Sequence, residues 1–323
     1  MASQKKKIAV LMGGPSSEHE VSLKSGENVV KNINPEKYEA RKVFISKKGE
    51  WEIPPENLKN QADVAFIALH GTYGEDGTIQ SILDQVQIPY TGSNAAASAL
   101  AMNKFLSLRL FRDAGLTTPM SLFVSKHDWH KNPFKIFNWV DHYAGYPLVV
   151  KPNDNGSSVG VYIPKNRGEF IGALENIFGI SRGALLQNFV QGREMTCGVL
   201  DYGPAETAFP LLPTEIIPQV SDFFDYRAKY EPGGSLEITP PPKLTDYLMR
   251  ALQKAAVQAH RLVGARGFSR TDFIVDKKGD IYILEINTIP GLTEQSLIPK
   301  AAQVSGIPFG DLIDIVIQSA SKI

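Results

Sequence analysis

Two runs of β-branched and aromatic residues near the carboxyl end of the chain place the strongest constraint on its fold. Residues 269–276 (SRTDFIVD) and 281–287 (IYILEIN) flank the short polar segment 277–280 (KKGD). Runs of this kind on either side of a glycine-containing turn predict an antiparallel β-hairpin. Because side chains alternate along a strand, each strand places a set of polar residues on one face.

The polar side chains of the hairpin lie on faces that one register brings together. Arg270 and Asp272 share a face of the first strand, and Glu285 and Asn287 share a face of the second. If residues 277–280 form a four-residue loop, Asp272 lies opposite Glu285 and Arg270 lies opposite Asn287. Directly opposed side chains are roughly 5 Å apart. We therefore expect two carboxylates, an amide and a guanidinium to converge.

Two carboxylates this close repel each other, and a divalent cation between them converts the repulsion into ligation. Carboxylate and amide oxygens without His or Cys suit a hard ion such as Mg²⁺, and Arg270 is available for an anion. The alternative is a solvated acidic edge of a structural hairpin. We expect Ile274 and Ile283 on the same faces as the acids, which favours a site. In the loop that follows, Gly291 permits a close approach of the backbone to a ligand.

Composition excludes several classes of partner. The chain has 323 residues, enough for two or three domains, and its 34 Lys and Arg residues equal its 34 Asp and Glu residues. Without a net field, we expect neither nucleic acid nor a membrane as a partner. A single cysteine, Cys197, excludes an internal disulfide and fits a reducing compartment. The apolar run at residues 8–12 is too short for a signal peptide or a membrane span, so we expect a cytoplasmic protein.

The beginning of the chain predicts a strand followed by a helix. The apolar strand at residues 8–12 ends in two glycines, and Ser17 with Glu20 forms a capping box that starts the helix. The box leaves Glu18 free at the carboxyl end of the strand, which is where open parallel sheets bind ligands. In the alternative interpretation, Glu18 only complements the helix dipole.

A later strand, residues 64–69, delivers His70 and the glycine-rich loop 70–77 to the same edge of the sheet. The alternation of strand, helix and strand predicts a parallel sheet, and we place the end of this domain near Gly92. His70 is either a functional residue beside Glu18 or a structural histidine.

The chain lacks the GxGxxG and GxxxxGK[ST] patterns, which leaves a dinucleotide fold and a P-loop unsupported. The glycine-rich candidate is residues 155–160 (NGSSVG), between expected strands at 148–151 and 159–163. The amides and hydroxyls of such a hairpin tip could cover phosphates, although Gly and Ser also make plain turns. Lys151, at the end of an apolar strand, and Lys104, at the beginning of a helix, are candidate phosphate ligands. In the alternative interpretation, both are ordinary solvated lysines at the ends of their elements.

Two further segments are candidates for nucleotide and substrate contacts. Residues 184–200 form two short strands with a break at 191–192. Val190 lies beside the break and Glu194 begins the second strand, so the break could hold a planar base. The irregular stretch 221–243 is longer than ordinary loops, and its aromatic residues favour a lid.

Together these motifs resemble those of the D-alanine:D-alanine ligases of the ATP-grasp superfamily, from residue 8 to the last expected helix. The segments that carry the resemblance are GGPSSEHEVS at 13–22, ALHGTYGEDG at 68–77, YTGS at 90–93, VVKPNDNGSSVGV at 149–161, DYRAKY at 225–230, SRTDF at 269–273 and LEINTIPGLTEQSLIP at 284–299. The lid motif DYRAKY and the loop HGTYGEDG are specific to these ligases, whereas the hairpin marks only the superfamily.

The resemblance implies an α/β, three-domain ATP-grasp fold. Its parts are an N-terminal parallel-sheet domain at 1–92, a central ATP-grasp domain at 93–190, and a C-terminal ATP-grasp domain at 191–323 with the metal site and the lid loop 221–243. In the implied reaction, ATP phosphorylates the carboxylate of one D-alanine, and the amine of a second D-alanine displaces phosphate. The dipeptide serves peptidoglycan synthesis. ATP, two Mg²⁺ ions or Mn²⁺ in their place, and a homodimer are implied in the same way.

The resemblance also implies roles for individual residues. The metal ligands are Asp272, Glu285 and Asn287. The ATP-binding residues are Lys104, Lys151, Ser157, Ser158, Gln187, Asn188, Val190 and Glu194. The catalytic residues are Glu18, Ser157, Tyr230, Arg270 and Gly291. The substrate-binding residues are Glu18, His70, Lys229, Tyr230, Ser296 and Leu297. Among these, Arg270 and the Gly291 amide stabilise an oxyanion, and Glu18 pairs with the first substrate's ammonium group.

Two departures from the family pattern stand near the expected nucleotide. Gln187-Asn188 replaces the frequent Glu-Lys pair, which keeps an acceptor for the adenine amino group but removes its charge, and Asn103 replaces the Asp before Lys104. Three alternatives remain open at this point. They are a D-alanine:D-lactate ligase, which would lack Tyr230, a non-catalytic ATP-grasp nucleotide-binding protein, and a ligase for another acid and amine.

Overall fold

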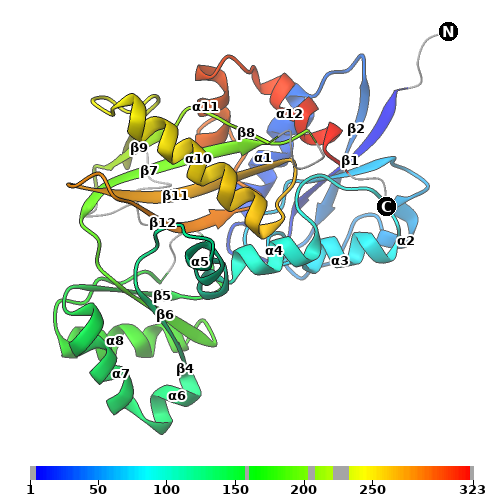
Figure 1. The fold of residues 1–323 in the computed structure, drawn as a ribbon. Coiled ribbons are helices and arrows are strands. Elements are labelled where there is room, and N and C mark those ends of the chain that lie inside the picture. Colours follow the sequence, from blue (N-terminus) through cyan, green and yellow to red (C-terminus); the bar gives the residue numbers. More distant parts are fainter. Residues whose placement is uncertain (1–4, 157–159, 203–207, 221–232, 321–323) are drawn as a thin grey trace.

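The computed structural model describes residues 5–156, 160–202, 208–220 and 233–320. Within these residues the strands form three sheets (Figure 1). The first has the order β2-β1-β3 and is parallel, the second has the order β4-β6-β5 and is antiparallel, and the largest runs β10-β9-β7-β11-β12 with β8 paired to β7. The predicted α/β class with an N-terminal parallel sheet is confirmed.

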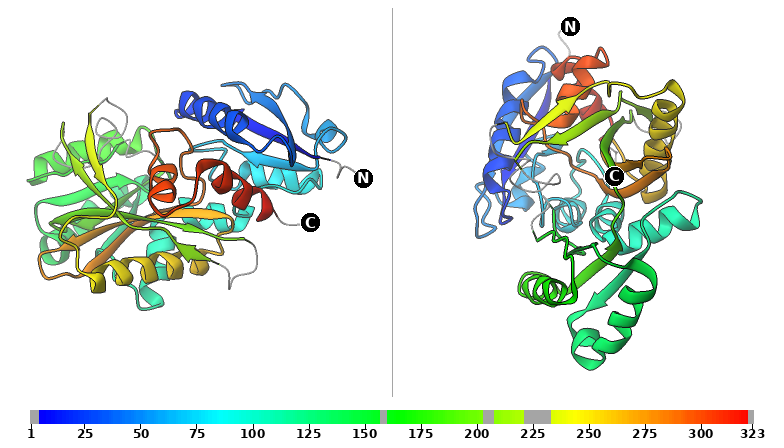
Figure 2. Two further views of the ribbon diagram at one scale, coloured as in Figure 1. Left: turned by 90° about the horizontal axis from the view of Figure 1, so that it is seen from above. Right: turned by 90° about the vertical axis from the view of Figure 1, so that its left-hand side faces the viewer.

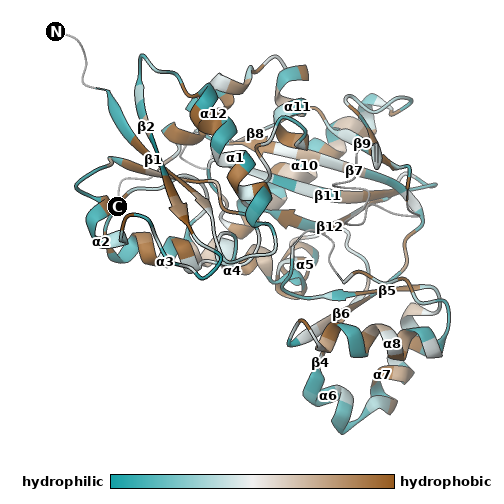
Figure 3. Ribbon diagram, turned by 180° about the vertical axis from the view of Figure 1, so that it is seen from behind, coloured by the Kyte–Doolittle hydropathy of each residue, from teal (hydrophilic) through white to brown (hydrophobic). Residues whose placement is uncertain are grey.

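The N-terminal parallel sheet follows from one long apolar strand. Its elements are β1 (Lys6–Gly13), α1 (His19–Asn32), β2 (Tyr38–Ile45), α2 (Pro55–Leu58), β3 (Val64–Ile67) and α3 (Thr78–Gln85). The central strand β1 buries its last six residues in succession. Parallel strands covered on both faces have continuous apolar runs of this kind, and Figure 3 shows β1 as largely hydrophobic.

The antiparallel β4-β6-β5 sheet and its helices project from the rest of the molecule (Figure 2). The elements are β4 (Ser121–Ser125), α6 (Lys126–Lys131), α7 (Pro133–Trp139), the π-helical turn η1 (Val140–Ala144), β5 (Leu148–Pro152), α8 (Arg167–Phe178) and β6 (Gly183–Asn188). Phe170 and Leu174 of α8 are fully buried in a separate core with Val150 and Leu186 of the sheet. The expected strand at 159–163 is absent from its described part, where only Tyr162 pairs with Val150 in an isolated bridge.

The largest sheet carries the hairpin predicted from the sequence. Its strands are β7 (Gly192–Leu200), β8 (Phe209–Pro210), β9 (Thr214–Pro218), β10 (Ser235–Ile238), β11 (Phe268–Asp276) and β12 (Ile281–Asn287). Helix α10 (Asp246–Val263) packs along it; Thr245 caps the start of the helix by accepting from the Leu248 amide, and the left-handed Gly264 ends it. Helices α4 (Ala95–Met102) and α5 (Lys104–Asp113) contact β12 and α10.

The register of the hairpin agrees with the prediction at the acids but not at the turn. Asp272 pairs with Glu285, whereas Val275 pairs with Ile281 and the Asp276 amide donates to the Asp280 carbonyl. The loop is therefore one residue shorter than expected, and a β-bulge at Leu284 restores the register.

The bulge also reverses the expected face of one side chain. Ile283 is 1% exposed and lies in the core with Phe273 and Ile286, while Leu284 and Glu285 face the cavity on the other side. The expectation that Ile283 shares the face of Glu285 was therefore wrong. Ile274 does line this cavity with Asp272, as predicted.

The last two helices, α11 (Leu297–Val304) and α12 (Phe309–Gln318), return to the N-terminal part of the chain. Leu312 and Val316 of α12 are fully buried in the same core as Val10 and Phe66. Helices α1 and α12 are in contact. No described helix combines the length and the apolar character needed to cross a membrane.

Asp314 anchors α12 to β2. Its carboxylate accepts from Lys37 Nζ at 2.6 Å and from the Tyr38 hydroxyl. Burial raises the pKa of Asp314, but the bonds from Lys37 and Tyr38 lower it more, so the pKa lies below its usual value. Ionised Asp314 therefore stabilises the fold above its unfolded pKa of about 3.9, and this contribution is lost as the pH falls through the depressed folded pKa.

We expect Asp314→Asn to lower the free energy of unfolding by about 1 kcal/mol at pH 7. The difference from the unsubstituted protein should shrink as the pH falls below about 4. Urea denaturation of both proteins across this range measures it. Glu27→Gln, which removes an exposed ion pair with Lys42 at 3.5 Å, is the control and should change the free energy by less than about 0.5 kcal/mol. A difference that is constant with pH would contradict the assignment.

Candidate active site

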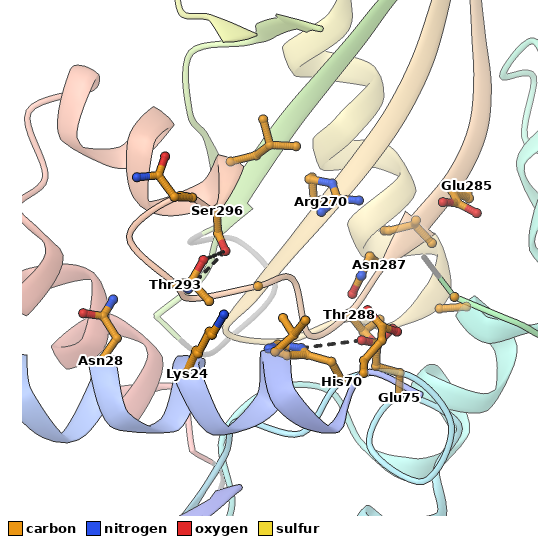
Figure 4. A pocket seen from close by; sticks show the side chains of 18 of the residues that line it. Lys24, Asn28, His70, Glu75, Arg270, Glu285, Asn287, Thr288, Thr293 and Ser296 are labelled. Atoms are coloured by element: carbon orange, nitrogen blue, oxygen red, sulfur yellow. Dashed lines mark hydrogen bonds and ion pairs between the residues drawn. The ribbon is translucent and has the colours of Figure 1, made fainter. Parts of the chain in front are cut away.

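Two cavities meet beside the β11–β12 hairpin. The larger, of about 590 Å³, lies between α1, the loop after β3, the hairpin and residues 288–297. Figure 4 shows side chains from these segments pointing into it. The smaller, of about 150 Å³, lies between the β4-β6-β5 sheet and the largest sheet. Lys104 and Glu285 line both cavities, so these two side chains stand at the junction between them.

The hairpin brings the predicted charges together. Arg270 Nε and Nη2 donate to the two carboxylate oxygens of Asp272, each at 2.9 Å, and Thr196 Oγ1 donates to Asp272 Oδ1 at 2.7 Å. Burial lowers the pKa of Arg270, but the Asp272 and Glu285 carboxylates raise it more. Arg270 is therefore a permanent cation, and its planar fork suits an oxyanion.

Lys104 links the hairpin to the β4-β6-β5 sheet. It is the first residue of α5 and is 7% exposed. Its Nζ lies 3.2 Å from Glu285 Oε2 and donates to the Asn155 carbonyl at 2.7 Å. Asn103 caps α5 by accepting from the Leu106 amide and also accepts from Asn153 Nδ2 at 3.0 Å. Asn at this position therefore does the work of a helix cap.

The smaller cavity has the lining of a small-molecule pocket. Its walls are mostly apolar, with Val149, Ile216, Ile274 and Leu284 among them, and Lys151, Val190 and Glu194 complete the lining. Apolar walls with a few polar groups are typical of cofactor pockets.

Gln187 and Asn188 at the edge of this pocket also hold the chain before β4. Gln187 Nε2 donates to Ser121 Oγ at 3.0 Å, and Asn188 Oδ1 accepts from the Met120 amide at 2.7 Å. A lysine at position 188 could not accept this bond, because its side chain has no acceptor. Asn188 therefore has a structural role here. Both residues line the cavity.

Glu18 lies where the sequence placed it, but the predicted capping box is wrong. The Ser16 hydroxyl, not that of Ser17, holds the start of the helix: it accepts from the Glu18 amide at 3.0 Å and donates to the His70 carbonyl at 2.6 Å. Glu20 instead pairs with Lys47 at 3.1 Å. The Ser16 hydroxyl thereby joins the segment after β1 to the segment after β3.

Two glycines approach the Glu18 carboxylate. A Cβ on Gly71 would lie 2.8 Å from Glu18 Oε2, and one on Gly156 would lie 3.0 Å from it. Gly71 also has φ +73°, a conformation that favours glycine. The loop after β3 and the glycine-rich loop of the central part therefore meet at Glu18.

His70 is a buried hub of hydrogen bonds. Its Nε2 lies 2.8 Å from Ser25 Oγ, and its Nδ1 lies 3.0 Å from the Ile289 carbonyl and 3.7 Å from Glu75 Oε1. Burial lowers the pKa of His70, but the Glu75 carboxylate raises it more, so the pKa lies above its ordinary value. Burial has the opposite effect on the Glu75 carboxyl group, whose pKa it raises.

Sequence reasoning missed Glu75 and Ser25. Glu75 lies in the glycine-rich loop 70–77, which was a usable signal. Ser25 has no such marker, because only the fold brings α1 against His70 and the Leu292 amide, which donates to Ser25 Oγ at 3.3 Å.

Gly291, Ser296 and Leu297 form the far wall of the larger cavity. A Cβ on Gly291 would lie 2.7 Å from Ser296 Oγ, so close packing requires glycine there. Ser296 Oγ accepts from the Thr293 amide at 3.0 Å. Leu297 begins α11, and free amides at a helix start favour an anion.

The described site residues divide between the two cavities. The larger is lined by Glu18, His70, Lys104, Arg270, Glu285, Asn287, Gly291, Ser296 and Leu297. The smaller is lined by Lys104, Lys151, Gln187, Asn188, Val190, Glu194, Asp272 and Glu285. Ser157, Ser158, Lys229 and Tyr230, with most of the expected lid, lie outside the described residues.

The hairpin oxygens fit a hard divalent cation. Asp272 and Glu285 are paired across the strands, and Asn287 follows on the same strand as Glu285. Asn287 Oδ1 accepts one bond, from the Ile289 amide at 2.8 Å, and retains a second lone pair. Within the described residues, no cluster of three His, Cys, Asp or Glu side chains forms an alternative metal site.

Comparisons with known proteins place these features in one family. The family model described as "D-ala D-ala ligase N-terminus" matches residues 7–60 and 52–93, and that described as "D-ala D-ala ligase C-terminus" matches residues 110–318. The D-alanine--D-alanine ligase of Geotalea uraniireducens is 41% identical over 322 residues, which are 98% of this chain and 96% of the relative.

Two solved ligase structures match this chain over nearly its whole length. The D-alanine--D-alanine ligase from Bacillus anthracis complexed with ATP has 33% identity and a TM-score of 0.81, with 98% of this chain and 97% of that one covered. The VanG D-Ala:D-Ser ligase from Enterococcus faecalis has 30% identity and a TM-score of 0.85, with 98% and 99% covered.

The two serines before α1 give a matched test of which hydroxyl holds the chain at the start of the helix. Ser16→Ala removes the bonds to Glu18 and His70, so we expect it to lower the free energy of unfolding by about 1 to 2 kcal/mol. Ser17→Ala is the control, since Ser17 is exposed, and should cost less than about 0.5 kcal/mol. Urea denaturation compares the two variants. A larger loss in Ser17→Ala would restore the capping box.

Proposed function

Because the chain belongs to the D-alanine–D-alanine ligase family, we propose that it uses ATP to join two D-alanines into D-alanyl-D-alanine for peptidoglycan synthesis. Its fold is the ATP-grasp fold of that family. The observation that carries the proposal is the junction of the two cavities at Lys104 and Glu285. A nucleotide in the smaller cavity and an amino acid in the larger one would meet there.

The chemistry needs two steps because a carboxylate is a poor acyl donor. First, the γ-phosphoryl group of ATP passes to a carboxylate oxygen of the donor D-alanine, giving D-alanyl phosphate and ADP. Next, the amine of the acceptor D-alanine attacks the acyl carbon, the carbon–oxygen bond to phosphate breaks, and the amine loses a proton. Phosphate leaves and a peptide bond remains.

The larger cavity would hold the donor and stabilise its reaction. The Glu18 carboxylate would pair with the donor ammonium group, and His70 would lie near the donor carboxylate. The Arg270 guanidinium and the Gly291 amide would stabilise the oxyanion of the tetrahedral intermediate. We assign Ser157 and Tyr230 to the link between lid and Glu18; both lie outside the described residues.

The smaller cavity would hold ATP. Lys104 and Lys151 would contact the phosphates beneath the loop that contains Ser157 and Ser158. Adenine would lie against Val190, with Gln187 and Asn188 at its edge, and Glu194 would complete the nucleotide site. Lys104 supports this orientation because it faces both cavities.

The metal would bind at the β11–β12 hairpin, and the acceptor would bind near residues 296–297. Asp272, Glu285 and Asn287 would hold two Mg²⁺ ions, with Mn²⁺ as a substitute, and bound ions would neutralise charge on the phosphates. Ser296, the Leu297 amide and Lys229, which lies outside the described residues, would hold the acceptor carboxylate.

We also propose a cytoplasmic homodimer that binds neither nucleic acid nor membrane. The domains would be residues 1–92, 93–190 and 191–323. The lid would lie within 221–243, although residues 235–238 of this stretch form β10 of the largest sheet and not the irregular loop expected from the sequence. The separate core of the β4-β6-β5 sheet supports a distinct central domain. The packing of α12 into the N-terminal core means that the last domain also supports the first.

The first experiment measures ADP release with ATP and Mg²⁺, and identifies products by mass. The substrates are D-alanine, L-alanine, D-alanine with D-lactate, and D-alanine with D-serine, the last because one similar structure is a D-Ala:D-Ser ligase. We expect D-alanyl-D-alanine from D-alanine alone. A mixed product formed in preference would reassign the acceptor, and no D-alanine product would refute the proposal.

Glu285→Gln tests the metal assignment. The substitution keeps the shape of the side chain but removes its charge, so we expect a folded protein with kcat lowered by about a thousandfold. Binding of Mn²⁺, followed by electron paramagnetic resonance with ATP present, should fall as well. Glu294→Gln, an exposed acid in the same cavity, is the control. Near-normal turnover in Glu285→Gln would remove the assignment.

Ser25→Ala tests whether the His70 hub positions the Gly291 loop. Loss of the Ser25 contacts frees His70 and the Leu292 amide, and we expect kcat to fall about ten- to a hundredfold through misplacement of the loop. Ser22→Ala is matched, because Ser22 is equally buried on α1 and bonds to the Gly13 amide and the Ala68 carbonyl. Both should lose similar stability in urea. Equal losses of kcat would show that Ser25 has no positioning role.

A further inference from the structure

The larger cavity extends well beyond the donor end. At about 590 Å³ it continues along α1 to the segment of Thr293 and Ser296. Figure 4 shows Lys24 pointing from α1 into this end, on the side of Thr293 and Ser296, whereas Glu285 and Asn287 lie at the other end. The proposed function assigns no role to Lys24.

The other described cations of the cavity are already paired. Arg270 is bound to Asp272 at 2.9 Å, and Lys104 lies 3.2 Å from Glu285. Lys31 lies 3.9 Å from Glu294. Within the described part of the chain, Lys24 makes no ion pair within 4.0 Å. It is thus available for an anion that enters the cavity.

The neighbouring acids on α1 do not form ion pairs with Lys24, because they pair with other lysines. Glu20, one turn before, lies 3.1 Å from Lys47. Glu27, nearly one turn after, lies 3.5 Å from Lys42 of β2. Acids three or four residues away are the usual helical partners of a lysine, so this arrangement leaves the Lys24 ammonium group to the cavity.

The same cavity is rich in acids and needs a cation for an anionic substrate. Its lining includes five acids, Glu18, Glu27, Glu75, Glu285 and Glu294. A free carboxylate that enters among these acids is repelled unless a positive group faces it. Lys24 supplies that group at the end near Ser296.

We propose that Lys24 binds the carboxylate of the acceptor D-alanine and so sets the affinity for the second substrate. This inference rests on the proposed function, in which Ser296 and the Leu297 amide mark the acceptor end. Lys24 acts as an exposed point charge that adds to those contacts. It does not touch the donor, whose carboxylate reacts at the Glu285 end.

The test separates the two D-alanine sites. For the acceptor, the rate of dipeptide formation against D-alanine concentration is fitted to two constants. For the donor, excess hydroxylamine replaces the acceptor; its nitrogen attacks the acyl carbon of D-alanyl phosphate, phosphate leaves, and D-alanine hydroxamate is measured. Hydroxylamine has no carboxylate, so its reaction does not depend on a carboxylate contact.

Lys24→Met, which keeps most of the stem, should raise the acceptor KM about three- to fivefold. Its hydroxamate rate and donor constant should stay unchanged. Lys24→Arg should restore the acceptor KM, and Lys24→Glu should raise it further. The effect in Lys24→Met should weaken at high salt, because exposed charges are screened. Lys31→Met is the matched control on the same helix and should leave both constants unchanged.

Each outcome is decisive. An unchanged acceptor KM in Lys24→Met, with normal hydroxamate formation, would overturn the assignment of Lys24 while the proposed function stands. Equal changes in the acceptor and hydroxylamine reactions would also overturn it, because they would indicate a structural or donor effect. If the unsubstituted protein forms neither dipeptide nor hydroxamate, the proposed function fails first.

Discussion

Charge balance at the β11–β12 hairpin is the constraint on which the rest of the site depends. Asp272 and Glu285 sit opposite each other on neighbouring strands, and an uncompensated pair would be strongly destabilising. Arg270 neutralises Asp272 from the same strand, while Lys104 reaches Glu285 from α5. Because Lys104 must arrive from another element, α5 has to pack against β12, and this contact places the smaller cavity beside the larger one.

The larger cavity in turn depends on buried hydrogen bonds between segments far apart in the chain. His70 holds the Ile289 carbonyl, Ser25 holds the Leu292 amide, and Asn28 Nδ2 donates to the Leu292 carbonyl at 2.7 Å. A buried polar group that loses its partner costs about 1 to 3 kcal/mol. The N-terminal part therefore holds the loop that contains Gly291 in one position, as the oxyanion role proposed for its amide requires.

Local patterns predicted most elements and the chemistry of the site. The apolar run of β1, the Thr245 cap and Gly264 stop of α10, and the hairpin all follow from side chains within a few residues of one another. The local rule for helix capping failed at the start of α1, where the expected capping box does not form. Ser17 has the spacing of a capping box, yet no side chain caps α1, and the Ser16 hydroxyl instead joins the Glu18 amide to the His70 carbonyl.

The sequence by itself determined which chemistry is present: a carboxylate pair, an amide and a guanidinium on one hairpin, with glycine-rich loops and lysines beside them. Tertiary structure decided which groups meet. The bulge at Leu284 turned Ile283 into the core while keeping Glu285 opposite Asp272, and the packing of α1 made Ser25 a partner of His70 and left Lys24 facing the cavity. The physical reason is that register and ion pairing depend on distances between strands and helices, and the spacing of residues along the chain does not set those distances.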